Sequence, residues 1–190
     1  MEKKDNLLPY YIGGGIVIAL GLYFIYSFTK DKKPKSNRAI IIGDSQTPYI
    51  AKQSQKAKML GEVGGTMSLW QGGKDLAWLL KAVKMTPVME DMGYVVINIG
   101  TNGGFNPKDD IAGLVNELKR VFPNAKLLAV KGSWGWGGNS NKTESQVNAY
   151  YDIFAKNGVK VLPTPIGPVE PHGDRPSYKK IGAEIDAEIK

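Results

Sequence analysis

The sequence predicts an α/β domain of three layers, in which a mostly parallel sheet lies between two layers of helices. First, its strand-like segments are apolar on both faces, which is typical of strands that are buried on both sides in a parallel sheet. Second, these segments alternate with amphipathic helical patterns, and parallel strands need such crossover helices. Third, 190 residues leave room for one such core and an appendage.

Four segments have the composition of buried strands and five have a helical pattern. The strands are expected at 39–43, 94–99, 126–130 and 159–162. The helices are expected at 48–60, 74–84, 107–122, 144–156 and 177–189. We expect Thr47 to cap the first helix with Pro48 as its first residue, and Asn106 to cap the third. Strands and helices therefore alternate over most of the chain.

The N-terminal segment has the composition of a membrane span. Residues 6–29 carry no charged side chain. Segment 7–28 would cover roughly 33 Å as a helix, which is enough to cross a bilayer. No Ala-x-Ala-like cleavage site follows it, so we expect an uncleaved, single-pass anchor rather than a signal peptide. The predicted parts are a tail and transmembrane helix at 1–29, a charged linker at 30–38 and a globular domain at 39–190.

Charge is concentrated next to the predicted span. Residues 1–38 hold 7 Lys and Arg against 3 Asp and Glu, whereas residues 39–190 hold 18 against 15. This distribution favours contact with anionic lipid headgroups and gives no indication of nucleic-acid binding. Five basic residues follow the span and two precede it, which by the positive-inside rule places the domain in the cytoplasm. An envelope-acting enzyme would lie on the other side, a virion membrane would allow either, and both orientations stay open.

Two clusters of polar residues directly follow predicted strands. Gly43-Asp44-Ser45 follows the first strand and Gly100-Thr101-Asn102 follows the second. Because the carboxyl ends of parallel strands meet at one edge of the sheet, we expect these residues to lie close together. The only histidine of the chain, His172, lies near the C-terminus. A serine, a histidine and an amide donor are the groups needed to attack an ester and hold the resulting oxyanion.

The ordered set Gly43-Asp44-Ser45-Gln46, Gly64-Gly65, Gly100-Thr101-Asn102 and His172 resembles the SGNH/GDSL hydrolase family over residues 39–190. The resemblance implies a flavodoxin-like sheet, with Ser45 as the nucleophile and His172 as the general base. It also implies an oxyanion hole made of the Ser45 backbone N–H, the N–H of Gly64 or Gly65, and the side-chain amide of Asn102.

The chain departs from the family beside the histidine. The family has an aspartate three residues before the histidine, and Val169 stands there instead. Glu170 and Asp174 are the nearby carboxylates, and a Ser–His dyad oriented by a backbone carbonyl is the third alternative. We expect Glu170 to orient His172, since its longer side chain compensates for the altered spacing.

A glycine-rich loop at 132–139 is expected to overhang the same sheet edge. Its two tryptophans, Trp134 and Trp136, suit either a stacking platform for a sugar ring or the walls of an acyl pocket. Packing of both side chains onto the domain is the alternative. Gly15 and Ala19 lie four residues apart in the span, but small residues at that spacing are common by chance, so a homo-oligomer stays possible and unsupported.

These residues predict a membrane-anchored serine esterase. An O-acetyl ester on a cell-wall or surface glycan is the first choice of substrate, and a lipid acyl ester is the second. The alternative is a catalytically silent binding or structural module of the same fold, tethered to a cell or virion membrane. No cofactor or metal is expected, because the chain has one histidine and no cysteine and lacks phosphate-loop and dinucleotide fingerprints.

Overall fold

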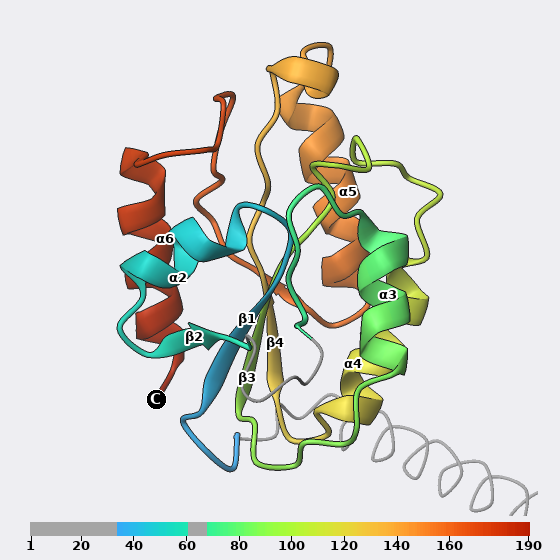
Figure 1. Ribbon diagram of the computed structural model, residues 1–190, viewed down its shortest axis with the longest axis vertical. Helices are drawn as coiled ribbons and strands as arrows, with labels where there is room; N and C mark the ends of the chain where they lie inside the picture. Colours follow the sequence, from blue (N-terminus) through green and yellow to red (C-terminus); the bar gives the residue numbers. More distant parts are fainter. Residues whose placement is uncertain (1–33, 61–67) are drawn as a thin grey trace, which may run out of the picture. The chain divides into compact units, whose positions relative to one another are not determined.

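The computed structural model describes residues 34–60 and 68–190, and within them it contains a parallel sheet of five strands (Figure 1). The strand order is β2-β1-β3-β4-β5, which is the flavodoxin-like order. The strands are β1 (Ala39–Gly43), β2 (Ala57–Met59), β3 (Tyr94–Asn98), β4 (Lys126–Ala129) and β5 (Lys160–Val161). All four neighbouring pairs are parallel, as the sequence predicts.

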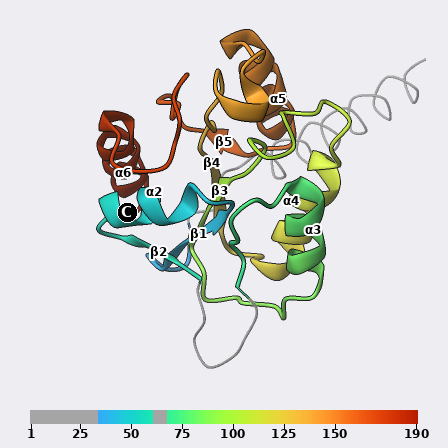
Figure 2. The same ribbon diagram turned by 45° about the horizontal axis from the view of Figure 1, so that its top comes forward.

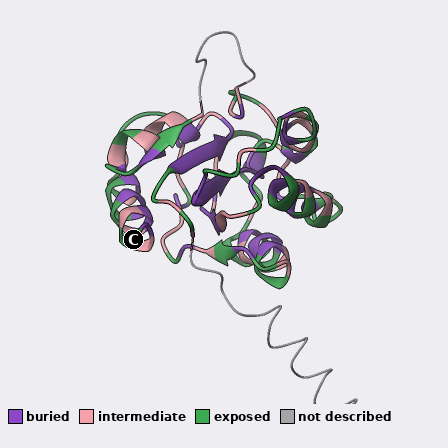
Figure 3. Ribbon diagram, turned by 90° about the horizontal axis from the view of Figure 1, so that it is seen from below, coloured by how far each residue is buried: buried purple, intermediate pink, exposed green. Residues whose placement is uncertain are grey.

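Helices cover both faces of the sheet (Figures 2 and 3). One face packs against α3 (Leu76–Lys84), α4 (Ile111–Val121) and α5 (Glu144–Lys156). The other face packs against α2 (Thr47–Gln53) and α6 (Pro176–Glu188). Along β1, Ile40 and Ile42 belong to the first core and Ile41 to the second. Burial on both faces explains why the central strands are mostly apolar, and the three-layer prediction is confirmed.

The first predicted helix is shorter in the structure. The helix predicted at 48–60 ends at Gln53, and the edge strand β2 follows it. Only the first of the three β2 residues is buried, so this strand lacks the apolar run that identified the others. Thr47 is the first residue of α2 and does not cap it.

The start of the third predicted helix also differs. The helix α4 begins at Ile111, because the Asp110 side chain accepts a hydrogen bond from the backbone N–H of Gly113 at 2.8 Å. Asn106, the predicted cap, instead accepts from the backbone N–H of Lys108 at 3.1 Å within a local turn. The competing carboxylate four residues later therefore sets the helix boundary.

Some predictions concern residues outside the described ranges. The predicted span at 7–28 and the linker as far as residue 33 are among them, and so are Gly64 and Gly65. None of the helices within 34–60 and 68–190 combines the length and apolarity that a bilayer crossing needs. The predicted start of the domain, residue 39, is the first residue of β1.

Candidate active site

Ser45 lies in the turn between β1 and α2, at the carboxyl edge of the sheet. Gly43 ends β1 with a φ of +142°, and a Cβ at this position would collide with the carbonyl oxygen of Asn98 on β3. The backbone N–H of Asp44 donates to that same oxygen at 3.0 Å, and the N–H of Thr47 donates to the Asp44 carbonyl at 3.1 Å. Contacts to the central strand β3 therefore fix the turn that presents Ser45.

The carboxyl group of Asp44 is fully buried beside the serine. Burial raises its pKa from the ordinary value of 3.8 to about 7, although the hydrogen bond from the Gln46 backbone N–H to Oδ1 at 3.0 Å acts in the opposite direction. Within the described ranges, no group contacts its Oδ2 atom at hydrogen-bonding distance. Asp44 is therefore held inside the domain, largely protonated below pH 7.

The structure brings Ser45, His172 and Glu170 together as a series of contacts, with His172 in the middle. The Nε2 atom of His172 lies 3.1 Å from the Ser45 Oγ, and the Nδ1 atom is paired with Oε1 of Glu170. The backbone N–H of His172 donates to the same Oε1 at 3.0 Å. Because a carboxylate can only accept, it favours the tautomer with the proton on Nδ1. That tautomer leaves Nε2 free to accept the proton of the serine hydroxyl.

Arg175 holds the carboxylate from the opposite side. Its Nη2 atom donates to Glu170 Oε2 at 3.1 Å, and its Nε atom donates to the Glu170 carbonyl at 2.7 Å. The hydrogen bond from the His172 backbone has the largest effect and lowers the pKa of Glu170 below its ordinary value. Desolvation acts in the opposite direction, and the His172 ring and Arg175 lower the pKa further. The carboxylate of Asp174, the other candidate, pairs with Lys52, whose Nζ atom lies 3.4 Å away. The sequence interpretation missed Arg175. A basic residue shortly after the histidine is the feature of the sequence that could have indicated it.

The predicted oxyanion donors are placed in part. Within the described ranges, no group accepts from the Ser45 backbone N–H, the first of the predicted donors. The Asn102 amide donates one hydrogen to the Lys74 carbonyl at 3.1 Å, and an amide carries a second. The segment that contains Lys74 also passes Ser45, because a Cβ on Gly72 would lie 3.6 Å from the Cβ of Ser45.

A second link, which the sequence interpretation missed, joins the serine turn to the loop of Asn102. The side chain of Gln46 donates to the Thr101 hydroxyl at 2.9 Å, and both residues are buried. Gln46 follows Ser45 and Thr101 precedes Asn102, so this single hydrogen bond connects the two predicted halves of the oxyanion hole. Each is an ordinary polar residue in the sequence, and only the fold brings them together.

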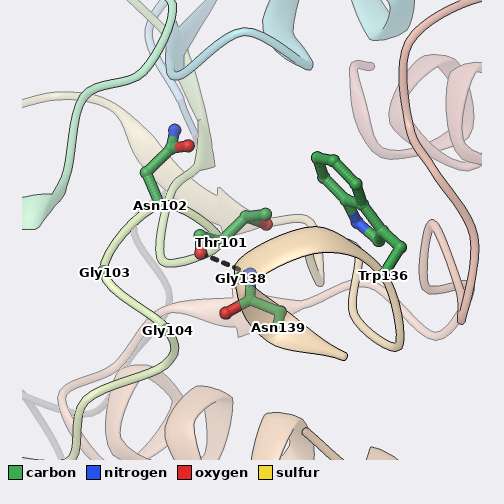
Figure 4. A pocket seen from close by; sticks show the side chains of 7 residues that line it. All are labelled: Thr101, Asn102, Gly103, Gly104, Trp136, Gly138 and Asn139. Atoms are coloured by element: carbon green, nitrogen blue, oxygen red, sulfur yellow. Dashed lines mark hydrogen bonds between the residues drawn. The ribbon is translucent and has the colours of Figure 1, made fainter. Parts of the chain in front are cut away.

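A cavity of about 330 Å³ opens beside these residues (Figure 4). Trp136 forms one wall, and its ring meets that of His172 edge to face at a centroid distance of 5.9 Å. The walls hold no charged or aliphatic side chain and are Thr101, Asn102, Gly103, Gly104, Trp136, Gly138 and Asn139.

Trp134 does not join Trp136 at this cavity. Only 5% of it is exposed, and it packs in the core on the side of α3, α4 and α5. The chain turns at Gly135, with a φ of +72°, between the two tryptophans. For Trp134 the structure shows the alternative that the sequence left open, which is packing onto the domain, because burial of its apolar ring outweighs exposure in the loop.

A second aromatic ring contacts His172 besides Trp136. Tyr49 on α2 lies edge-on at a centroid distance of 6.3 Å and stacks on Tyr178 at 5.8 Å. The hydroxyl of Tyr178 donates to the carbonyl of Pro171 at 2.7 Å. This stack supports the short exposed segment that presents His172.

Comparison with solved structures finds the same fold at low sequence identity. A lipase/acylhydrolase from Enterococcus faecalis has a TM-score of 0.51 and 12% identity, over 80% of this chain and 94% of that one. A member of the lipolytic protein G-D-S-L family from Veillonella parvula has a TM-score of 0.50 and 10% identity, over 77% of this chain and 94% of that one. No protein-family model and no curated protein matches the chain by sequence. The likeness shows that this chain shares the fold of these two proteins.

Proposed function

We propose that this protein is a serine ester hydrolase. The observation that carries the proposal is the contact of Ser45 Oγ with His172 Nε2 at 3.1 Å, with Glu170 paired to the other ring nitrogen. This is the geometry of a nucleophile, a general base and an orienting acid. The two solved structures of the same fold are described as a lipase/acylhydrolase and a lipolytic protein, which supports the same class of reaction.

The reaction follows from these two contacts and the oxyanion donors. His172 removes the proton of Ser45 as Oγ bonds to the ester carbonyl carbon. The oxyanion accepts hydrogen bonds from the Ser45 backbone N–H and the Asn102 amide, with Gly64 or Gly65 as the proposed third donor. Collapse of this intermediate releases the alcohol, which takes the proton from the imidazolium. Water, deprotonated by His172, then attacks the acyl-serine, releases the acid and restores the hydroxyl of Ser45.

For the substrate, we place an O-acetyl ester on a cell-wall or surface glycan first and a lipid acyl ester second. The cavity beside Trp136 supports this order, because its walls offer amide groups, glycine backbone and one aromatic ring. Such walls suit hydroxyl groups and the faces of sugar rings better than a long alkyl chain. The apolar segment 7–28 supports a position at a membrane surface, which would bring either kind of ester within reach.

Labelling of the full chain with a fluorophosphonate probe tests the proposal without a choice of substrate. We expect mass spectrometry to find the label on Ser45, and we expect it to disappear in His172→Ala. Ser140→Ala is the matched control, since it changes a serine in the exposed part of the loop beside the cavity and should label normally. A folded chain that takes no label would favour the silent binding module instead.

A further inference from the structure

Ser133 is a fully buried residue that contacts three segments of the candidate site. It lies in the loop after β4, and its backbone N–H donates to the Thr101 hydroxyl at 3.2 Å. Its own hydroxyl donates to the carbonyl of Val169 and accepts from the indole Nε1 of Trp136 at 2.6 Å. No role was expected for Ser133 from the sequence.

We propose that Ser133 is a positioning residue of the esterase, whose hydroxyl fixes Trp136 against His172 and anchors the segment that carries Glu170 and His172. This inference rests on the proposed ester hydrolysis. The residue does not touch the reacting atoms, and it acts through the two groups to which its hydroxyl is bonded.

The chemistry of the hydroxyl suits this position. A serine hydroxyl donates one hydrogen bond and accepts others, so one atom satisfies a carbonyl and an indole N–H together. Val169 directly precedes Glu170, and the donated bond therefore holds the backbone next to the orienting acid. Trp136 meets the His172 ring at 5.9 Å, so the accepted bond fixes a neighbour of the base.

The backbone around Ser133 does not depend on its hydroxyl. Ser133 and Gly167 form a parallel bridge, and the N–H of Trp134 donates to the Gly167 carbonyl at 3.2 Å. The N–H of Ile166 donates to the Lys131 carbonyl at 3.0 Å. Because these bonds join the two segments without the side chain, Ser133→Ala is expected to fold and to lose only the orientation of Trp136 and of the Val169 carbonyl.

The close approach of Ser133 to Thr101 depends on its neighbour Gly132. A Cβ on Gly132 would collide with the Thr101 hydroxyl, which already accepts from Gln46 and from Ser133. The loop of Trp136 is thus built against the loop of Asn102, and Trp136 forms both a wall of the cavity and a contact of the base. Release of Trp136 should therefore slow the chemical step more than it weakens binding.

The test measures the concentration dependence of fluorophosphonate labelling on the full chain for wild type, Ser133→Ala, Trp136→Phe and the double variant, with Ser140→Ala as control. We expect Ser133→Ala to lower the maximal labelling rate about tenfold with an unchanged half-saturating concentration. The reason is that a small displacement of Trp136 and of the segment with His172 slows the reaction of Ser45 with the probe. Trp136→Phe keeps an aromatic ring and removes the N–H, so the double variant should lose less than the product of the two single losses.

The outcomes separate the inference from the proposed function. Wild-type protein that labels normally, together with Ser133→Ala that labels at the same rate, would overturn the positioning role alone. Fully multiplicative losses would overturn the route through Trp136. Wild-type protein that takes no label would remove the proposed function, and the role of Ser133 with it. A maximal rate that falls together with the Ser140→Ala control would mean a general effect of the loop, and it would also overturn the inference.

Discussion

The two halves of the candidate site are held in opposite ways. On the nucleophile half, Asp44, Gln46 and Thr47 are all buried, and their hydrogen bonds reach the central strand β3 and the Thr101 loop. On the base half, the side chains of His172 and Glu170 are 47% and 44% exposed. Their polar contacts come mostly from the short segment 170–175 itself.

This difference suggests that the two halves of the site contribute differently to stability and to activity. Exposed ion pairs contribute little to stability, so the ordered chain from Arg175 through Glu170 to His172 is not explained by folding. The buried serine turn, in contrast, is part of the same packing that closes the sheet. We therefore expect changes in the base half to alter activity alone, and changes in the nucleophile half to alter stability as well.

The largest expected effect is that of His172→Ala. Loss of the general base should lower kcat by about 10³-fold or more, as for other serine hydrolases. The midpoint of urea unfolding should stay at the wild-type value, because the side chain is half exposed. Ester hydrolysis and denaturation curves on the same preparations check both statements. A large loss of stability would break the comparison, since it would make His172 part of the core.

Asp44→Asn tests the buried half. The pKa of Asp44 is raised from 3.8 to about 7 by burial, so between these pH values the unfolded chain is ionised while the folded one keeps its proton. The wild type should therefore lose about 4 kcal/mol of stability as pH rises from 4 to above 7. Asparagine keeps an oxygen for the Gln46 N–H and does not titrate, so most of this loss should vanish. Urea unfolding at several pH values measures it, and equal slopes in both proteins would contradict the burial argument.

The third effect distinguishes two carboxylates in the exposed half. Glu170→Ala should lower kcat by about tenfold or more, because the imidazole loses its orienting partner. Asp174→Ala is the matched control, since its carboxylate pairs with Lys52 on the surface and should leave kcat unchanged. Equal activity of wild type and Glu170→Ala, measured side by side, would remove Glu170 from the site.

Much of the fold is readable in the sequence because the central strands are buried on both faces. The runs at 39–43, 94–99 and 126–130 are mostly apolar, and each strand lies within a residue of its prediction. The edge strand β2 has no such apolar run, because Lys58 and Met59 are exposed. Edge strands lack a neighbour on one side, and a short one is hard to separate from the end of a helix.

The site is predictable where a strand end fixes it. Ser45 and Asn102 lie shortly after the carboxyl ends of β1 and β3, so topology alone assigns them to one edge of the sheet. Gln46, Ser133 and Arg175 could not be assigned, because their partners lie in distant segments or in a loop whose path only the fold determines. Trp134 and Trp136 show the same limit, since a single residue, Gly135, separates a core side chain from a side chain that lines the cavity.

The smallest expected effect concerns the cavity that Trp136 lines. Gly138 lines it, and a Cβ there would meet no atom of the described residues within 4 Å. Gly138→Leu should therefore fold normally and narrow the space beside Trp136. If the cavity holds the sugar side of the ester, KM for an acetylated sugar should rise about tenfold while hydrolysis of a nitrophenyl acetate stays unchanged.

Ser145→Leu, an exposed change on α5 that does not line the cavity, is the control. Equal losses on both esters would instead assign the cavity to the acyl group, because that is the part the two substrates share.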